Sequence, residues 1–271
     1  MGRPGNVKGS AMGAVSLVDV SKRFDLRMGS EVHTVQALDR INLTVQDGEI
    51  MVLIGPSGCG KTTALRVAMG LEHASRGKVM VDGREVHGCG YDRGLVFQHA
   101  ELLPWLTALQ NVMFGLEMKG VHGAELRDTA MRYLELVGLK DSANRRPHQL
   151  SGGMKQRVGI ARALAIDPKV LLMDEPFGAL DAQARESLQG ELLDIHERTG
   201  KTILFVTHDL DEAALLADRV VVMRNGEIQE IITCDLPKPR GDLGRLRGSA
   251  EFATVRYRIW QALHEAPPVK Q

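Results

Sequence analysis

The sequence has few cysteines, few aromatic residues and no excess of charge of either sign. Its three cysteines, Cys59, Cys89 and Cys234, form no C-x-x-C pair and no metal-binding spacing, so a reduced, cytosolic compartment is the simplest expectation. Aromatic residues make up only 4%, which is low for a surface on which bases stack. Lys plus Arg and Asp plus Glu number 34 each, so the net charge is zero. We therefore expect no nucleic-acid partner.

Long apolar runs are also missing. No run reaches the roughly 18 residues that a membrane-spanning helix needs, and we expect no signal peptide. Any role at a membrane is therefore expected at its cytoplasmic face, as a peripheral protein that acts through a partner. The 271 residues suit one large domain or two small ones and are ample for a sizeable core.

What the chain does contain is a phosphate-binding loop. The motif G-x-x-x-x-G-K-[ST] is formed by Gly55, Pro56, Ser57, Gly58, Cys59, Gly60, Lys61 and Thr62. A continuous apolar run at residues 50–54 predicts a buried strand before the loop, and residues 62–69 predict a helix after it. Backbone N–H groups and the helix dipole then converge on a polyphosphate. Lys61 is expected to reach the outer phosphates and Thr62 to offer its hydroxyl to Mg²⁺. A chance glycine turn would leave both flanking elements unexplained.

The residues around this loop predict short strands. Alternation of apolar and polar residues indicates half-buried strands at residues 15–20 and 41–45, with a loop at residues 25–34 between them. Asp47-Gly48 predicts a hairpin turn into the strand that precedes the phosphate-binding loop. These early strands are therefore expected to form a small antiparallel subdomain beside the nucleotide core.

The middle of the chain lacks strand signals and predicts helices instead. An apolar stripe at residues 124–137, followed by Gly138 as a C-cap, indicates one helix. A second helix is expected at residues 154–165, with Ser151 as a candidate N-cap. We therefore predict a helical subdomain, at about residues 99–154, inserted into the core.

In the second half, apolar strands alternate with amphipathic helices, which predicts a parallel sheet, and Asn225-Gly226 predicts a closing hairpin. The predicted fold class is α/β: a P-loop NTPase (RecA-like) core with a small antiparallel β subdomain and an inserted helical subdomain. The predicted boundaries are a disordered tail at residues 1–13, a nucleotide-binding domain at 14–232, a linker at 233–249 and a C-terminal helix at 250–266.

Polar residues follow several predicted strands, at the edge where a parallel nucleotide sheet faces the phosphates. Asp174 ends an apolar strand and is expected to hold Mg²⁺ directly or through water, while Glu175 can polarise the attacking water. His208 follows another strand and could bind the γ-phosphate, and Gln98 could touch both the metal and a mobile element. Taken singly, these residues would also fit a solvated acidic turn, a structural histidine or an ordinary glutamine.

A second helix start of the anion-binding kind is formed by Leu150-Ser151-Gly152-Gly153. One P-loop already serves one nucleotide, so the economical use of this second start is on a nucleotide held by another copy of the chain. The pattern therefore predicts a head-to-tail homodimer with two ATP molecules at its interface. An ordinary capped helix would show the same local sequence.

Together, these motifs resemble the ATP-binding subunit of an ABC transporter over about residues 15–232. The motifs that match in order and spacing are the P-loop, Gln98, residues 150–156, Asp174-Glu175, residues 179–181 and His208. The resemblance implies that residues 55–63, including Thr63, bind ATP as the Walker A motif. It implies that Ser151 and Gly153 contact the γ-phosphate of the opposite site and that Asp181 belongs to the D-loop.

The resemblance also implies catalytic roles. Asp174 is expected to hold Mg²⁺ through water, and Glu175 is expected to be the general base. His208 matches the switch histidine, and Gln98 matches the Q-loop glutamine, a ligand of the metal and part of the hydrolytic machinery. Phe24 falls where the family stacks an aromatic ring on adenine.

Finer motifs resemble importers of the nitrate, sulfonate and taurine group, at residues 94–98, 102–105 and 175–181 and in a C-terminal helix with Arg256 and Trp260. This implies an ATPase that energises uptake of a small solute through a separate transmembrane permease, fed by a periplasmic or extracellular solute-binding protein. Two other uses stay open: a soluble ABC-type ATPase without transport, and the ATPase of an export or lipid-transport system.

Overall fold

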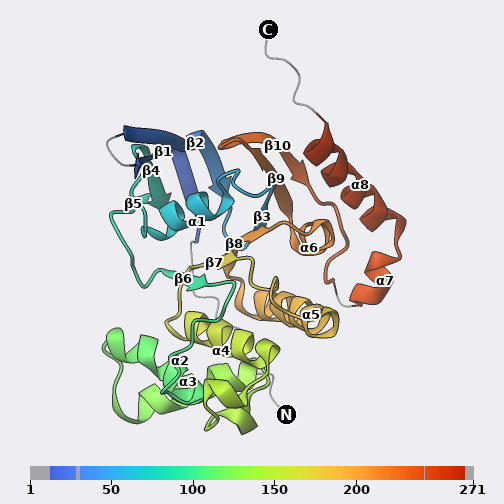
Figure 1. The fold of residues 1–271 in the computed structure, drawn as a ribbon. Helices are drawn as coiled ribbons and strands as arrows, with labels where there is room; N and C mark the ends of the chain where they lie inside the picture. Colours follow the sequence, from blue (N-terminus) through green and yellow to red (C-terminus); the bar gives the residue numbers. More distant parts are fainter. Residues whose placement is uncertain (1–12, 29–30, 241, 266–271) are drawn as a thin grey trace.

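The computed structural model describes residues 13–28, 31–240 and 242–265, and two β-sheets organise them (Figure 1). The larger sheet contains, in spatial order, β10 (Glu227–Thr233), β9 (Arg219–Arg224), β3 (Ile50–Ile54), β8 (Thr202–Thr207), β7 (Val170–Asp174) and β6 (Arg93–Val96). All its pairings are parallel except the hairpin of β9 with β10. The polar ends of β7 and β8 therefore meet at one edge.

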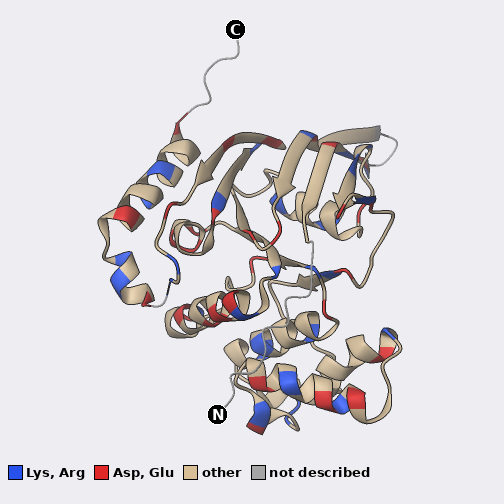
Figure 2. Ribbon diagram, turned by 180° about the vertical axis from the view of Figure 1, so that it is seen from behind, with Lys and Arg blue, Asp and Glu red and all other residues tan. Residues whose placement is uncertain are grey.

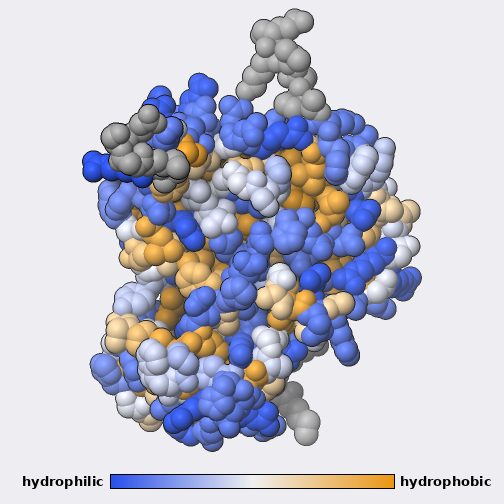
Figure 3. Space-filling view, in the orientation of Figure 1, coloured by the Kyte–Doolittle hydropathy of each residue, from blue (hydrophilic) through white to orange (hydrophobic). Residues whose placement is uncertain are grey.

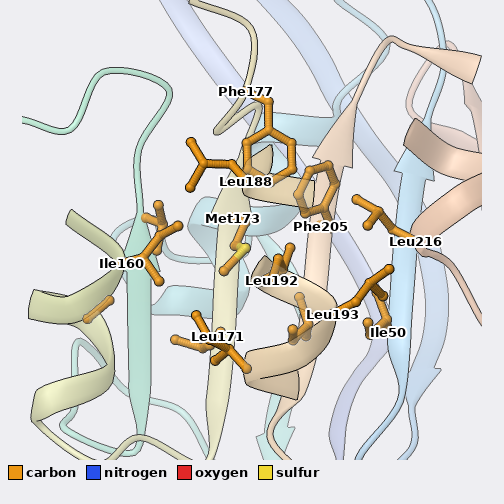
Figure 4. Close-up of a cluster of buried hydrophobic side chains, with 14 of the residues drawn as sticks. Ile50, Ile160, Leu171, Met173, Phe177, Leu188, Leu192, Leu193, Phe205 and Leu216 are labelled. Atoms are coloured by element: carbon orange, nitrogen blue, oxygen red, sulfur yellow. The ribbon is translucent and has the colours of Figure 1, made fainter. Parts of the chain in front are cut away.

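The parallel strands are buried on both faces, which explains their continuous apolar sequences. On one face, side chains of α1 (Lys61–Met69) share a buried core with Met51 and Leu53 of β3. On the other face, Ile50 of β3 joins side chains from α4 (Gly152–Ala165), α5 (Ala182–Thr199) and α6 (Leu210–Leu216). Figure 4 shows this second core, in which the rings of Phe177 and Phe205 lie 5.5 Å apart. The α/β P-loop NTPase fold is therefore confirmed.

The smaller sheet is antiparallel and lies beside α1. It contains, in spatial order, β2 (Glu31–Val45), β1 (Val15–Met28), β4 (Arg76–Val81) and β5 (Arg84–Glu85). The loop predicted at residues 25–34 is wrong, because β1 continues to Met28 and β2 starts at Glu31, with Asp25 paired to Thr34. The described residues of these strand ends lie in solvent, so their sequence lacks the alternation that a half-buried strand shows.

The hairpin predicted at Asp47-Gly48 is also wrong. The two residues do form a turn, in which Glu49 N donates to Gln46 O, but β2 and β3 belong to different sheets. Gly48 N donates to Thr202 Oγ1 of β8 (2.9 Å), so the turn is anchored to the larger sheet. A turn dipeptide fixes the reversal of the chain but not the strand with which the next segment pairs.

A helical lobe projects from the β6 edge and contains α2 (Ala108–Met118), α3 (Gly123–Leu136), the short helices η1 (Lys140–Ser142) and η2 (Pro147–Gln149), and α4 (Figure 1). Gly138 follows α3 in the left-handed conformation, as expected. Helix α4 packs on α2 and α3 and also on β6 and α5. It therefore connects the lobe to the sheet. Residues of both charge signs are interspersed over lobe and body (Figure 2).

The C-terminal part folds back along the sheet. Asn225 and Gly226 both have positive φ and form the predicted hairpin of β9 and β10. The linker predicted at residues 233–249 is wrong for its second half, which contains α7 (Leu243–Arg247), and Arg240 within it is buried. Arg240 donates to the carbonyls that end α6, so this residue of the predicted linker caps a helix. The final helix α8 (Ala250–His264) follows.

The predicted N-terminal tail and the last residues of the chain fall mostly outside the described residues. Residues 1–12 of the predicted tail and residues 266–271 are not described, whereas Gly13 is buried beside Thr202. Within the described part of the chain, no helix is both long and apolar enough to cross a bilayer.

Candidate functional site

The phosphate-binding loop joins β3 to α1 through two glycines with positive φ, Gly58 (77°) and Gly60 (104°). A Cβ at Gly60 would lie 2.5 Å from the carbonyl oxygen of Ala37, and one at Gly55 would lie 2.2 Å from that of Met223. Side chains are therefore excluded at these positions. Because Gly60 is the N-cap and offers no side-chain oxygen, no side chain of the N-cap occupies the first N–H groups of α1, and a helix start of this kind suits an anion.

Lys61 is only 6% exposed, and its ammonium closes the loop. Nζ donates to the carbonyls of Gly55 (2.7 Å) and Pro56 (3.1 Å), and it lies 3.9 Å from Cys59 Sγ. The loop therefore has a fixed positive charge at its centre. Pro56, Ser57 and Gly58 are exposed at the rim, whereas Thr62 and Thr63 are half-buried in the first turn of α1.

The structure brings Thr62 and Asp174 together, although 112 positions separate them in the sequence. Thr62 Oγ1 donates to Asp174 Oδ1 (3.0 Å). Burial raises the pKa of Asp174 above its ordinary value, and the hydrogen bond from Thr62 offsets part of this rise. A hydroxyl beside a carboxylate, at a loop built for phosphate, is the hard oxygen donor set that Mg²⁺ prefers. These two residues therefore fit the predicted metal site.

Glu175 and His208 form a second contact at the same edge. They follow β7 and β8, which are neighbours in the sheet, and His208 Nδ1 lies 3.0 Å from Glu175 Oε2. Glu175 has a positive φ of 45°, a strained conformation for a residue other than glycine, and its N–H donates to Val206 O (2.9 Å). The two adjacent acids have different partners, Thr62 for Asp174 and His208 for Glu175.

Gln98 is exposed just after β6 and lies beside the loop that follows Glu175. A Cβ added to Gly178 would be 3.2 Å from Gln98 Nε2. Two residues of α4 hold this segment, and sequence reasoning missed both. Gln156 donates to Phe97 O (2.9 Å), and Arg162 donates to the carbonyls of Ala100 and Glu101. A buried glutamine on an otherwise apolar helix face was the signal that could have identified one of them.

The second helix start is where the sequence predicted it. Ser151 is exposed and caps α4 by accepting a hydrogen bond from Met154 N (3.3 Å). A Cβ at Gly153 would lie 3.5 Å from the Cβ of Ala184 in α5, whose N-cap is Asp181. The side chains of α4 and α1 belong to different cores on opposite faces of the larger sheet. In one copy of the chain, Gly153 therefore adjoins α5, and the start of α4 belongs to a different core from the helix of the phosphate-binding loop.

Phe24 lies on β1 and is half-buried. Its ring has the ammonium of Lys22 4.7 Å from its centroid, and that lysine is held by Glu72 and the carbonyl of His73. The adenine-stacking role of Phe24 stays a prediction.

Comparison with known proteins agrees with this geometry. The sequence profile of the ABC transporter family matches residues 38–178. An uncharacterized ABC transporter ATP-binding protein of Methanocaldococcus jannaschii is 52% identical over 85% of each chain. The nitrate import ATP-binding protein NrtD of Synechocystis is 46% identical over 88% of this chain and 90% of its own. The bicarbonate transport ATP-binding protein CmpD of Synechococcus elongatus is 46% identical over 88% and 86%.

A solved structure supports the same assignment. The dimeric, post-hydrolysis ATP-binding cassette MJ0796, bound to ADP and Pi, is 36% identical and superposes with a TM-score of 0.71 over 81% of this chain and 98% of its own. The chain belongs to the ABC transporter family, as an ATP-binding subunit of the nitrate-type group. It is an ABC-type ATPase, and its family hydrolyses ATP to drive transport.

Proposed function

We propose that this chain is the ATP-hydrolysing subunit of an importer for a small solute of the nitrate, sulfonate or taurine type. It would act as a homodimer on a separate permease at the cytoplasmic face of the membrane. The observation that carries the ATPase part is the convergence of Lys61, Thr62, Asp174, Glu175 and His208 at one sheet edge.

In the proposed mechanism the phosphate-binding loop and Lys61 hold the triphosphate of ATP. Glu175 accepts the proton of the attacking water, and His208 keeps its carboxylate oriented through the 3.0 Å contact. Mg²⁺, held by Thr62 and Asp174 with Gln98 nearby, would neutralise charge on the β- and γ-phosphates. The strained backbone of Glu175 fixes the base before the substrate arrives.

The homodimer is supported by the position of the second helix start. Ser151 is exposed and Gly153 is half-buried, and neither belongs to the core that holds the P-loop helix. In a head-to-tail dimer, Ser151 and Gly153 of one copy would contact the triphosphate that the other copy binds. The similar cassette MJ0796 was solved as a dimer.

The proposed binding site for the permease is an apolar groove between the sheet body and the helical lobe (Figure 3). The groove has a volume of about 460 Å³, and its lining includes Met69, Tyr91, Leu95 and Ile166. Large apolar side chains are exposed on the neighbouring part of the lobe: Trp105 (66%), Met118 (60%) and Phe114 (41%). Exposed apolar surface of this kind marks an interaction site.

We assign the transported solute only to a chemical class, that of small anions. Relatives at the same identity are named for nitrate and for bicarbonate, two small anions. We propose that the permease and a solute-binding protein outside the membrane select among such solutes, because the described sites of this chain are built for ATP.

The decisive experiment is to purify the tagged chain from native membranes in mild detergent and to identify the proteins that accompany it. A multi-span permease at matching stoichiometry is the expected result, and a co-purifying solute-binding protein would establish import. A soluble partner would instead favour a non-transport ATPase, and a permease whose genuine substrate leaves the cell would favour export.

A further inference from the structure

The turn that carries His208 rests on a buried polar side chain that the mechanism above does not use. Glu212 of α6 is 4% exposed and precedes the buried apolar residues 213–216 of the same helix. A buried carboxylate generally stabilises a fold less than a hydrophobic residue of similar size would. Packing alone therefore does not explain why a glutamate occupies this position.

Glu212 closes the turn around His208. Thr207, the last residue of β8 and 2% exposed, donates from Oγ1 to Glu212 Oε2 (2.6 Å). The same Oγ1 accepts a hydrogen bond from Asp209 N (3.0 Å), and Asp209 Oδ1 accepts one from Glu212 N (3.0 Å). The residues on both sides of His208 are therefore tied to Glu212, while the imidazole itself is 63% exposed and contacts Glu175.

The polar chain continues away from the site. The other oxygen of Glu212 accepts a hydrogen bond from Gln189 Nε2 of α5 (3.4 Å), and Gln189 is 2% exposed. Gln189 Oε1 in turn accepts one from the Arg247 guanidinium of α7 (2.7 Å), which also contacts Glu186. Arg185 lies 3.9 Å from Glu212. A continuous path therefore leads from the C-terminal segment, through α5 and α6, to the turn that carries His208.

We propose that Glu212 is a positioning residue for His208, and that Gln189 and Arg247 make the rate of hydrolysis depend on the docking of α7. The proposal rests on the role proposed for His208. Because the imidazole is exposed, the backbone of its turn decides whether Nδ1 reaches the Glu175 carboxylate. One carboxylate oxygen of Glu212 binds Thr207 and the other binds Gln189, which in turn binds Arg247. Loss of Arg247 therefore frees the amide of Gln189, weakens its hold on Glu212 and loosens the turn that carries His208.

The test compares Thr207→Val with Thr207→Ser in the full-length chain. The valine variant removes the hydroxyl, and we expect kcat for ATP hydrolysis to fall about tenfold, a part of the 10²–10⁴ that a positioned acid or base supplies. KM for ATP should change less than twofold. The serine variant keeps the hydroxyl and should retain at least half of the wild-type kcat. Glu212→Gln provides a second variant should valine impair folding, which thermal unfolding will show.

The link to the C-terminal segment is tested by Arg247→Met, with Arg245→Met on the same helix as a matched control. We expect kcat to fall about threefold in the first variant at constant KM, and to stay unchanged in the second. Unchanged kcat in Thr207→Val and Glu212→Gln would overturn the proposal. So would a parallel loss of kcat, ATP binding and melting temperature in the valine and serine variants alike, because that pattern indicates a structural role.

His208→Ala, measured beside these variants, separates the proposed role of His208 in hydrolysis from the proposed positioning role of Glu212. If His208→Ala hydrolyses ATP at the wild-type rate, the proposed role of His208 fails. If it is impaired while the Thr207 and Glu212 variants are not, only the positioning role fails.

Discussion

At the scale of single residues, the site depends on which strand ends are neighbours. Asp174 and Glu175 are adjacent in sequence, yet Asp174 contacts Thr62 of α1 and Glu175 contacts His208, which follows the neighbouring strand β8. The sequence could predict these residues because the chemistry requires their types at the ends of apolar strands. It could not predict that His208 contacts Glu175, because this contact depends on β7 and β8 being neighbours in the sheet.

Glu175→Gln is expected to bind ATP and dimerise but to hydrolyse ATP about 10²–10⁴ times more slowly, since the amide cannot accept the proton of water. Phosphate release under single-turnover conditions measures the rate, and binding of a fluorescent ATP analogue is the control. Full turnover in this variant would remove Glu175 from the role of base.

Asp174 is expected to make the free energy of unfolding depend on pH. Burial raises its pKa, so the folded protein holds the proton more tightly than the unfolded chain, and the stability contributed by this group is lost as pH rises through the raised pKa. Asp174→Asn does not titrate. In metal-free solution, its free energy of unfolding relative to wild type should therefore increase as pH rises above about 4. Urea titrations between pH 4 and pH 8 measure the difference, and a constant difference would contradict the assignment.

At the scale of elements, motif-bearing helices were predictable and long-range pairings were not. Ser151 caps α4 as predicted, because capping is a local interaction within four residues, and Asp181 caps α5 in the same way although its cap was not predicted. The strand ends at residues 25–34, the hairpin expected at Asp47-Gly48 and the second half of the linker at 233–249 were predicted wrongly. The pairing of β3 with β8 depends on residues far away in the sequence, whereas Asp25 and Thr34 pair only nine positions apart, in strand ends that lie in solvent and lack alternation.

Ser151→Arg is expected to reduce hydrolysis by at least tenfold while ATP binding to the isolated chain persists, since the new side chain would occupy the place of the opposite γ-phosphate. The lost cap itself costs about 1 kcal/mol. Thr107→Arg is the matched control, because Thr107 caps α2 in the same lobe. Normal turnover of Ser151→Arg would show that the head-to-tail dimer is wrong.

Arg240→Ala should lower the free energy of unfolding by about 1–3 kcal/mol, because the carbonyls of Leu215 and Ala217 lose a buried donor. The neighbouring Lys238 is exposed and pairs with Asp218, so Lys238→Ala should cost less than about 1 kcal/mol. Chemical denaturation measures both. Equal effects would mean that Arg240 is no more than a surface cation.

At the scale of the whole molecule, β3 supplies alternate side chains to the two cores: Ile50 to one, Met51 and Leu53 to the other. Neither core can open without moving a strand that the other core holds. The melting of the two faces should therefore be cooperative, with probes placed in α1 and in α5 reporting one shared transition. A strand that links the cores in this way lets a displacement on one face be felt on the other.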